Sequence, residues 1–157
     1  MEKNNLSLSL KSLLCGALIS SFCWVMPLSA SAQSSTSGIK SAMSALGYNY
    51  TAYNTVLTGK TGSTKYARAY TDVDAEQNLP GGYMGARPML YDSSGNVAAS
   101  GTWSYSSANT SGISRGKSYE GFSGTPSYYS QGYARIWMGT DYWTYGTFAS
   151  PCLNDYT

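Results

Sequence analysis

A two-residue alternation of large and small side chains is the feature that most constrains how this chain can fold. Between Tyr66 and Thr71, a tyrosine or arginine at each even position is followed by an alanine or threonine. A similar alternation runs from Tyr128 to Met138, with Arg135 and Trp137 on one face. Successive side chains of a β-strand point to opposite faces of the sheet, so a period of two predicts strands.

Composition favours the same fold class along the rest of the chain. All 15 tyrosines lie between residues 48 and 156, among many serines, threonines and glycines. Aromatic residues favour strands, and each buried ring supplies a large apolar area. We therefore expect an all-β protein. The predicted architecture is an antiparallel β-sandwich of about six or seven short strands, with a small barrel as the alternative.

Turn residues mark the expected boundaries of several strands. Asp92–Gly95 is typical of a type I turn with a left-handed glycine, which predicts a hairpin. Pro88 restricts the expected strand at 83–91 to a sheet edge or a bulge, because proline cannot donate to the ladder. The segment 106–125 is rich in serine and glycine. It is expected to be a long loop that is either functional or contains a short strand at 117–122.

The first 32 residues have the pattern of a signal peptide. A short basic start precedes a mostly apolar run at 13–26, which is too short for a comfortable membrane span. Ala30–Ala32 then supplies the small residues of a cleavage site, so Gln33 is the expected start of the mature protein. We therefore expect a secreted, extracellular protein with no stable membrane span after cleavage.

The mature part is expected to contain a leader and one domain. Residues 33–47 predict a polar leader or a short helix, in which Ser37 is the N-cap and Gly47 ends the helix. The helix would place Ile39, Met43 and Leu46 on one face. Residues 48–157 have a suitable length for a single β domain.

Charge and cysteine content limit the environment and the partners. Without the signal, eight basic and seven acidic residues leave a net charge of about +1. Nucleic-acid binding needs clustered cations, so no nucleic-acid partner is expected. Cys152 is the one cysteine of the mature part and cannot form an internal disulfide. A secreted domain without disulfides fits a Gram-positive bacterium.

The absence of histidine restricts the chemistry that the chain can perform. It excludes Ser-His-Asp triads and histidine-ligated zinc, and the sequence has no phosphate-binding glycine loop. We therefore expect no enzymatic activity. The remaining enzymatic alternative is a carboxylate-dependent polysaccharide hydrolase, in which the cluster of Asp72, Asp74 and Glu76 acts with Glu120 or Asp141 as a distant partner.

Three alternating acidic residues are a candidate metal site. Asp72, Asp74 and Glu76 resemble part of a calcium shell, although the EF-hand spacing and its glycine are missing. A weak Ca²⁺ site is one interpretation of this cluster. A solvated strand end is the other, and no further cofactor is expected.

Aromatic residues of the second half are the candidate ligand-binding site. Exposed aromatic faces of β-sandwich modules stack on sugars or pack against proteins, whereas buried rings build the core. In this chain, the alternation places Trp143 and Tyr145 on one face and Tyr142 on the other. The candidates are Trp103, Tyr133, Trp137, Tyr142, Trp143 and Tyr145.

Two segments carry a resemblance to a known group of proteins. They are Tyr128–Ile136, with its Tyr-Tyr-Ser and Gly-Tyr-Ala elements, and Gly101–Tyr105, with its Gly-Thr-Trp element. Both are similar to small secreted β-sandwich proteins of Gram-positive bacteria, among them the lactococcin 972-type bacteriocins. The resemblance implies a toxin that acts on cell-envelope assembly without enzymatic activity.

These observations favour a secreted, non-enzymatic protein that binds an extracellular or cell-envelope component. The expected partner is a cell-wall glycan or an extracellular protein. The alternative is a bacteriocin-like antibacterial protein. Arg87, Arg135 and the region of Lys117 also predict a weak basic patch for an anionic wall polymer.

Overall fold

The computed structural model describes residues 32–157, which form twelve β-strands and no helix. The strands are β1 (Gln33–Thr36), β2 (Lys40–Ala45), β3 (Tyr48–Thr61), β4 (Thr64–Leu79), β5 (Met84–Arg87), β6 (Met89–Asp92), β7 (Val97–Ser100), β8 (Ser104–Tyr105), β9 (Thr110–Glu120), β10 (Tyr128–Ser130), β11 (Tyr133–Trp137) and β12 (Tyr142–Gly146). Every strand pairing is antiparallel. The predicted all-β class is therefore confirmed.

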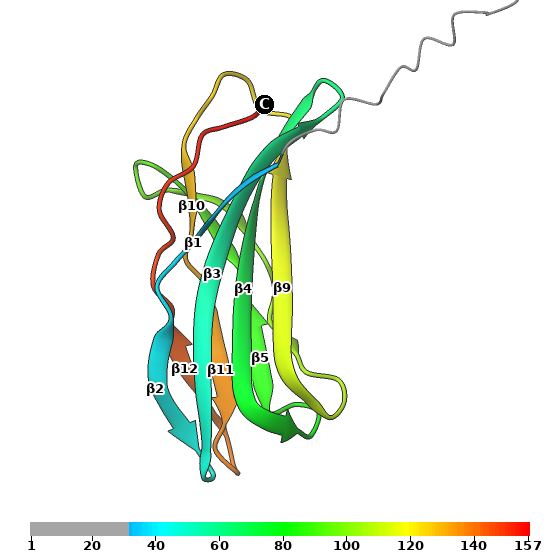
Figure 1. Cartoon of the computed structure of the whole chain (residues 1–157), viewed down its shortest axis with the longest axis vertical. Coiled ribbons are helices and arrows are strands. Elements are labelled where there is room, and N and C mark those ends of the chain that lie inside the picture. The colour runs from blue at the N-terminus through cyan, green and yellow to red at the C-terminus, as the bar shows by residue number, and fades with distance from the viewer. Residues whose placement is uncertain (1–31) are drawn as a thin grey trace, which may run out of the picture.

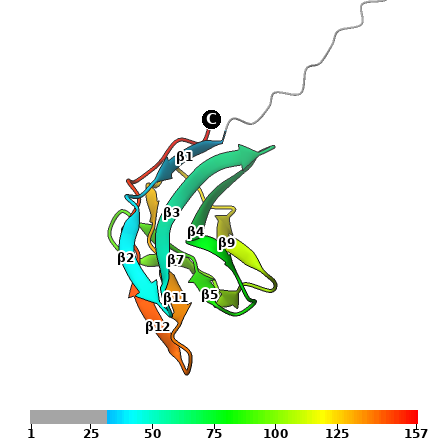
Figure 2. The same ribbon diagram turned by 60° about the horizontal axis from the view of Figure 1, so that its bottom comes forward.

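The first layer is a five-stranded sheet built around β3 and β4, the two longest strands (Figure 1). β9 pairs with one side of β4, while β1 and β2 follow one another along the free side of β3. Inward side chains alternate with outward ones from Tyr50 to Thr58 of β3 and from Ala67 to Val73 of β4, as the period of two predicts. Both strands curve strongly over the second layer, as Figure 2 shows.

The second layer consists of two short sheets that continue one another. One has the order β12-β11-β5-β8 and the other the order β10-β6-β7. Pro88 separates β5 from β6, and Gln131–Gly132 separates β10 from β11. Strands of both sheets contact β4, so the two layers form a β-sandwich. The sheets of residues 32–157 stay open and do not close into the alternative small barrel.

The interior contains two apolar clusters. Tyr50, Val73 and Ile136 belong to the larger cluster, which lies under β2 and β5. Val56, Leu90 and Tyr156 belong to the smaller cluster, which lies under β6 and β10. Both layers contribute large side chains and alanines to this interior.

A buried polar junction separates the two clusters. Asn54 of β3 accepts hydrogen bonds from Thr71 Oγ1 at 2.7 Å and from the Gly132 amide at 3.1 Å. Its amide group donates to Thr147 Oγ1 and to the Phe148 carbonyl. A Cβ atom at position 132 would collide with Thr71 Oγ1, so only glycine fits there. The junction therefore supplies hydrogen-bond partners for backbone groups at the break between β10 and β11.

The prediction of a polar leader or short helix at 33–47 is wrong. This segment forms β1 and β2 on β3. The three residues expected on one helical face do not share an environment, because Met43 is buried while Ile39 and Leu46 are exposed. The free backbone groups along the long edge of β3 supply partners that the local sequence does not reveal.

The predicted number of strands and the loop at 106–125 also need correction. β9 occupies most of this segment, not only its end, and pairs with β4 over most of its length. Serine and glycine are weak strand formers, but the Tyr70 ring lies within 2.7 Å of where a Gly116 Cβ would be. The Tyr70 ring covers Gly116 from the neighbouring strand and so supplies the packing that the glycine, which has no side chain, lacks. Pro88 does not place the predicted strand at 83–91 on a sheet edge. It divides this strand into β5 and β6, each of which has a partner strand on both sides.

The predicted hairpin at Asp92–Gly95 is confirmed. Gly95 has a φ of 86°, and Asp92 Oδ1 accepts hydrogen bonds from the amides of Ser94 and Asn96, both at 2.9 Å. These bonds hold the pKa of Asp92 below its usual value. The predicted signal peptide lies outside the described residues, except for Ala32. Among residues 32–157, no helix is long and apolar enough to cross a bilayer.

Candidate ligand-binding face

Alternate side chains of strand β11 point to the core and to the surface. Ala134 and Ile136 are fully buried, whereas Tyr133, Arg135 and Trp137 point away from the core. The neighbours of Arg135 are Gly85 on β5 and Thr144 on β12. The outer surface of the β12-β11-β5-β8 sheet is therefore centred on Arg135.

Five residues from three segments of the chain meet on this surface, and we call them the aromatic face. Its members are Trp103, Tyr105, Arg135, Trp137 and Tyr142. The Tyr105 ring lies 6.5 Å from Trp103 and 4.9 Å from Tyr142 between centroids. The Tyr142 ring in turn lies 5.0 Å from Trp137. The rings thus form a continuous row, and all five side chains are half-buried.

Arg135 holds the row together. Its guanidinium carbon lies 4.1 Å from the centre of the Trp103 ring, which is a cation–π geometry. Its Nη1 donates to Tyr105 Oη at 2.7 Å, and its Nε donates to Thr144 Oγ1 at 3.1 Å. Tyr105 can lie flat on the sheet because the residue beneath it is Gly85. The face is therefore fixed before any ligand arrives.

The six predicted aromatic residues are divided between two surfaces. Trp103, Trp137 and Tyr142 belong to the aromatic face. Tyr133 lies on the same side of β11, farther along and opposite Arg87. The face also contains Tyr105 and Arg135, which were not among the candidates. The two-residue spacing of Trp103 and Tyr105 is the signal that could have found Tyr105.

Trp143 and Tyr145 lie on the other side of β12, as the alternation predicts. Their rings stack with centroids 6.1 Å apart, and Lys40 Nζ lies 5.9 Å from the Tyr145 ring. Trp143 is 59% exposed, because β12 is an edge strand and projects beyond the core. The Trp143 and Tyr145 rings therefore do not belong to the row that contains Tyr142.

Two hollows adjoin the aromatic face at its Tyr142 end. One has a volume of about 230 Å³ and is lined by Gly81, Gly82, Tyr83, Trp137 and Tyr142. The other has a volume of about 470 Å³ and lies at the tip of the β11–β12 hairpin, around Asp141 and Trp143. Tyr142 Oη donates to the Gly82 carbonyl at 2.7 Å, which fixes its ring between the two hollows.

The predicted calcium cluster is not a loop but part of β4. Asp72 and Asp74 point outward on the same face, and Asn49 donates to both Glu76 carboxylate oxygens at 3.1 Å. Within residues 32–157, no group of three potential ligands could hold a metal ion. Asp72, Asp74 and Glu76 are therefore not gathered into the predicted ligand group. Desolvation raises the pKa of both aspartates, and the charge of Asp72 further raises the pKa of Asp74.

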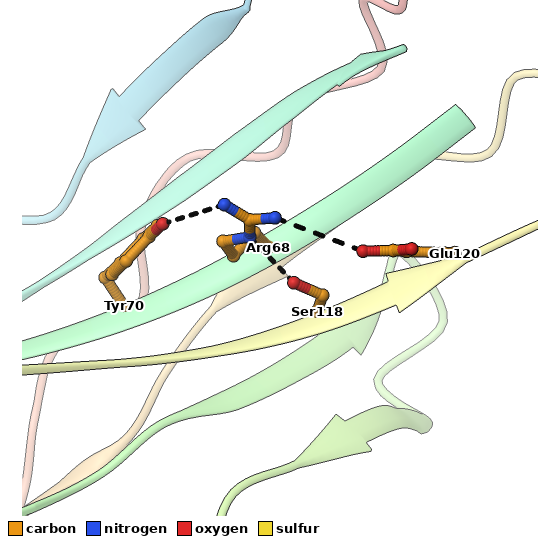
Figure 3. Close-up of polar contacts among 4 residues, drawn as sticks. All are labelled: Arg68, Tyr70, Ser118 and Glu120. Atoms are coloured by element: carbon orange, nitrogen blue, oxygen red, sulfur yellow. Dashed lines mark hydrogen bonds and ion pairs between the residues drawn. The ribbon is translucent and has the colours of Figure 1, made fainter. Parts of the chain in front are cut away.

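Glu120 is engaged elsewhere on the same outer surface. Arg68 lies between three partners: it donates to Ser118 Oγ at 2.7 Å and to Tyr70 Oη at 3.3 Å, and its Nη2 is 4.0 Å from Glu120 Oε1 (Figure 3). Glu120 is opposite Tyr66, whereas Asp72 is opposite Ser114. Six residues of strand correspond to about 20 Å, which exceeds the carboxyl separation that glycoside hydrolysis requires. The proposed carboxylate pairing with Glu120 therefore does not exist.

Comparisons with known proteins leave this geometry as the main guide to function. No family model matches the chain, and neither a curated protein nor a solved structure shows a significant match. The resemblance to lactococcin 972-type bacteriocins stays a prediction.

Proposed function

We propose that this protein is a secreted, non-enzymatic module that binds a glycan of the cell envelope through the aromatic face. The observation that carries the proposal is the row of rings from Trp103 to Trp137, fixed around Arg135. Sugar rings have flat apolar faces that stack on aromatic side chains, and their hydroxyls need polar neighbours. The row offers both kinds of contact.

Rigidity of the face supports binding. Side chains that become ordered only in the complex lose conformational entropy, which weakens association. Here Arg135 already has three interactions and Tyr142 is already bonded to Gly82. Much of this loss of side-chain entropy therefore occurs during folding and not on binding. Partial exposure of all five members leaves ring surface for a ligand.

The experiment is co-sedimentation of the purified protein with isolated Gram-positive cell walls, with soluble wall glycan as competitor. We expect binding that the soluble glycan removes. Trp103→Ala and Trp137→Ala should each weaken binding about tenfold or more, as for aromatic hot spots. Phe148→Ala is the control, because this exposed ring belongs neither to the aromatic face nor to the lining of the two hollows.

Two results would contradict the proposal. The first is a lack of sedimentation with walls of several compositions. The second is an equal loss with the Trp103, Trp137 and Phe148 variants while circular dichroism shows that each remains folded.

A further inference from the structure

We propose that the cavity between β9 and the β7–β8 connection binds a phosphate group, so that the ligand is a phosphate-bearing glycan. The inference rests on the proposed function, because it names the class of glycan that the aromatic face would hold. The cavity is separate from the rings themselves and contains none of the five members of the aromatic face.

The cavity has a volume of about 210 Å³. β9 contributes Arg115, Gly116 and Lys117 to its wall. The opposite wall is the connection from Ser100 to Ser104, together with Pro88. Its lining therefore combines two cations with three hydroxyl side chains and contains no carboxylate.

The two cations are not neutralised by acidic residues. Within residues 32–157, the ion pair at 4.0 Å or less is Arg68–Glu120, which involves neither Arg115 nor Lys117. Arg115 donates through Nη1 to the Ser114 carbonyl at 2.7 Å, which leaves most of its donors available. The half-buried Arg115 and the exposed Lys117 line the same hollow, and their like charges repel one another unless an anion lies between them.

Hydroxyl donors complete the site. Thr102 and Ser104 line the cavity, and in the described part of the chain their hydroxyls make no hydrogen bond. A phosphate presents acceptor oxygens in tetrahedral directions, whereas a carboxylate has two oxygens in one plane. Donors that approach from two opposing walls match the tetrahedral anion better.

Arg87 fixes the wall that carries these hydroxyls. Its Nη2 donates to Ser100 Oγ at 3.1 Å and its Nε donates to the Gly101 carbonyl at 3.2 Å. The Gly101 amide also donates to the Pro88 carbonyl at 2.8 Å. A third positive charge therefore lies directly behind the connection and adds to the attraction for an anion.

The connection joins this cavity to the aromatic face. Trp103 lies between Thr102 and Ser104, and its ring stacks against Arg135 on the outer surface. A sugar on Trp103 and a phosphate in the cavity would thus contact neighbouring residues of one segment. A polymer of sugars or polyols joined by phosphates has this combination of groups.

The test measures affinities for three polymers: poly(glycerol phosphate), neutral dextran and carboxylated polygalacturonate. Lys117→Gln and Arg115→Gln should each weaken poly(glycerol phosphate) binding about tenfold, since a charge-assisted hydrogen bond contributes about 1.5 kcal/mol or more. Lys60→Gln is the matched control: it removes one exposed charge from the first layer, at the β3–β4 end. Binding that is unchanged in both cavity variants, or equally tight for polygalacturonate, would overturn the inference.

A second measurement separates this inference from the proposed function. Titration with inorganic phosphate should shift the amide resonances of Thr102 and Gly116 in the wild type and not in Arg115→Gln. If Trp103→Ala binds every polymer like the wild type while this shift persists, the aromatic face fails as a glycan site and the phosphate site stands. If no phosphate shift occurs, the phosphate site is overturned whatever the polymers do.

Discussion

At the scale of single residues, the polar junction around Asn54 has the largest structural consequence. Asn54 is fully buried and makes hydrogen bonds to four groups from three segments. A leucine could fill the same volume, but it would leave the Phe148 carbonyl without a partner. Buried polar groups are costly when unpaired, so the asparagine specifies how the two layers align.

Asn54→Ala should lower the free energy of unfolding by about 3 kcal/mol, from lost hydrogen bonds and a new cavity. Urea denaturation followed by circular dichroism measures this change. Asn49→Ala on the same strand is the control, because Asn49 is exposed and its side chain donates to Glu76 at the surface. A similar loss in both variants would show that the junction has no special role.

At the scale of elements, β4 carries the acidic residues on a strand rather than in a loop. Desolvation on the sheet raises the pKa of Asp74, and the neighbouring charge of Asp72 adds to this shift. In the Asp92 turn, hydrogen bonds from Asn96 and Ser94 lower the pKa instead. The contributions of Asp74 and Asp92 to folding stability therefore change with pH in opposite directions.

Asp74→Asn should raise stability at pH 7 and have little effect at pH 3. The folded state holds this proton more tightly than the unfolded chain, so wild-type stability falls as pH rises from the unfolded pKa through the folded pKa. Asp92→Asn should do the reverse. Its pKa is lowered on folding, so its contribution exists above the unfolded pKa and disappears as pH falls through the folded value. Urea midpoints between pH 3 and pH 7 test both signs, and the same sign for the two variants would refute the assignment.

At the scale of the whole molecule, the last eleven residues close the sandwich. Thr147 completes the polar junction, and Leu153 pairs with Tyr128 through two backbone hydrogen bonds. Tyr156 is buried in the smaller cluster against Phe122, and its hydroxyl donates to the Pro126 carbonyl at 2.6 Å. This irregular segment thus covers an interior that the strands alone would leave open.

Tyr156→Ala should destabilise the protein by about 3 kcal/mol or more, because a large buried ring is lost. Tyr156→Phe should cost only about 1 kcal/mol, the contribution of one hydrogen bond. Thermal unfolding of the two variants separates the contribution of the Tyr156 ring to stability from that of its hydroxyl. If the alanine variant unfolds at the wild-type temperature, the segment does not stabilise the smaller cluster.

The sequence predicted those parts of the fold that have a clear local residue pattern. The alternation in Tyr66–Thr71 and Tyr128–Met138 predicted strands, and Asp92–Gly95 predicted a hairpin. Prediction failed for 33–47 and 106–125, because these segments are strands only through pairing with β3 and β4. The same limit applied to the site. Alternation separated Tyr142 from Trp143, but nothing local indicated that Arg135 meets Trp103.

The sequence by itself determined the all-β class and, in the strands with a clear alternation, the side to which each side chain points, because the period of two is a property of the extended backbone. Only the tertiary structure decided which strands pair and which segments share a surface. The aromatic face, the cavity at Arg115 and Lys117, and the Asn54 junction all join residues that are distant in the chain. Their assembly depends on the packing of two layers, and packing is a property of the whole molecule.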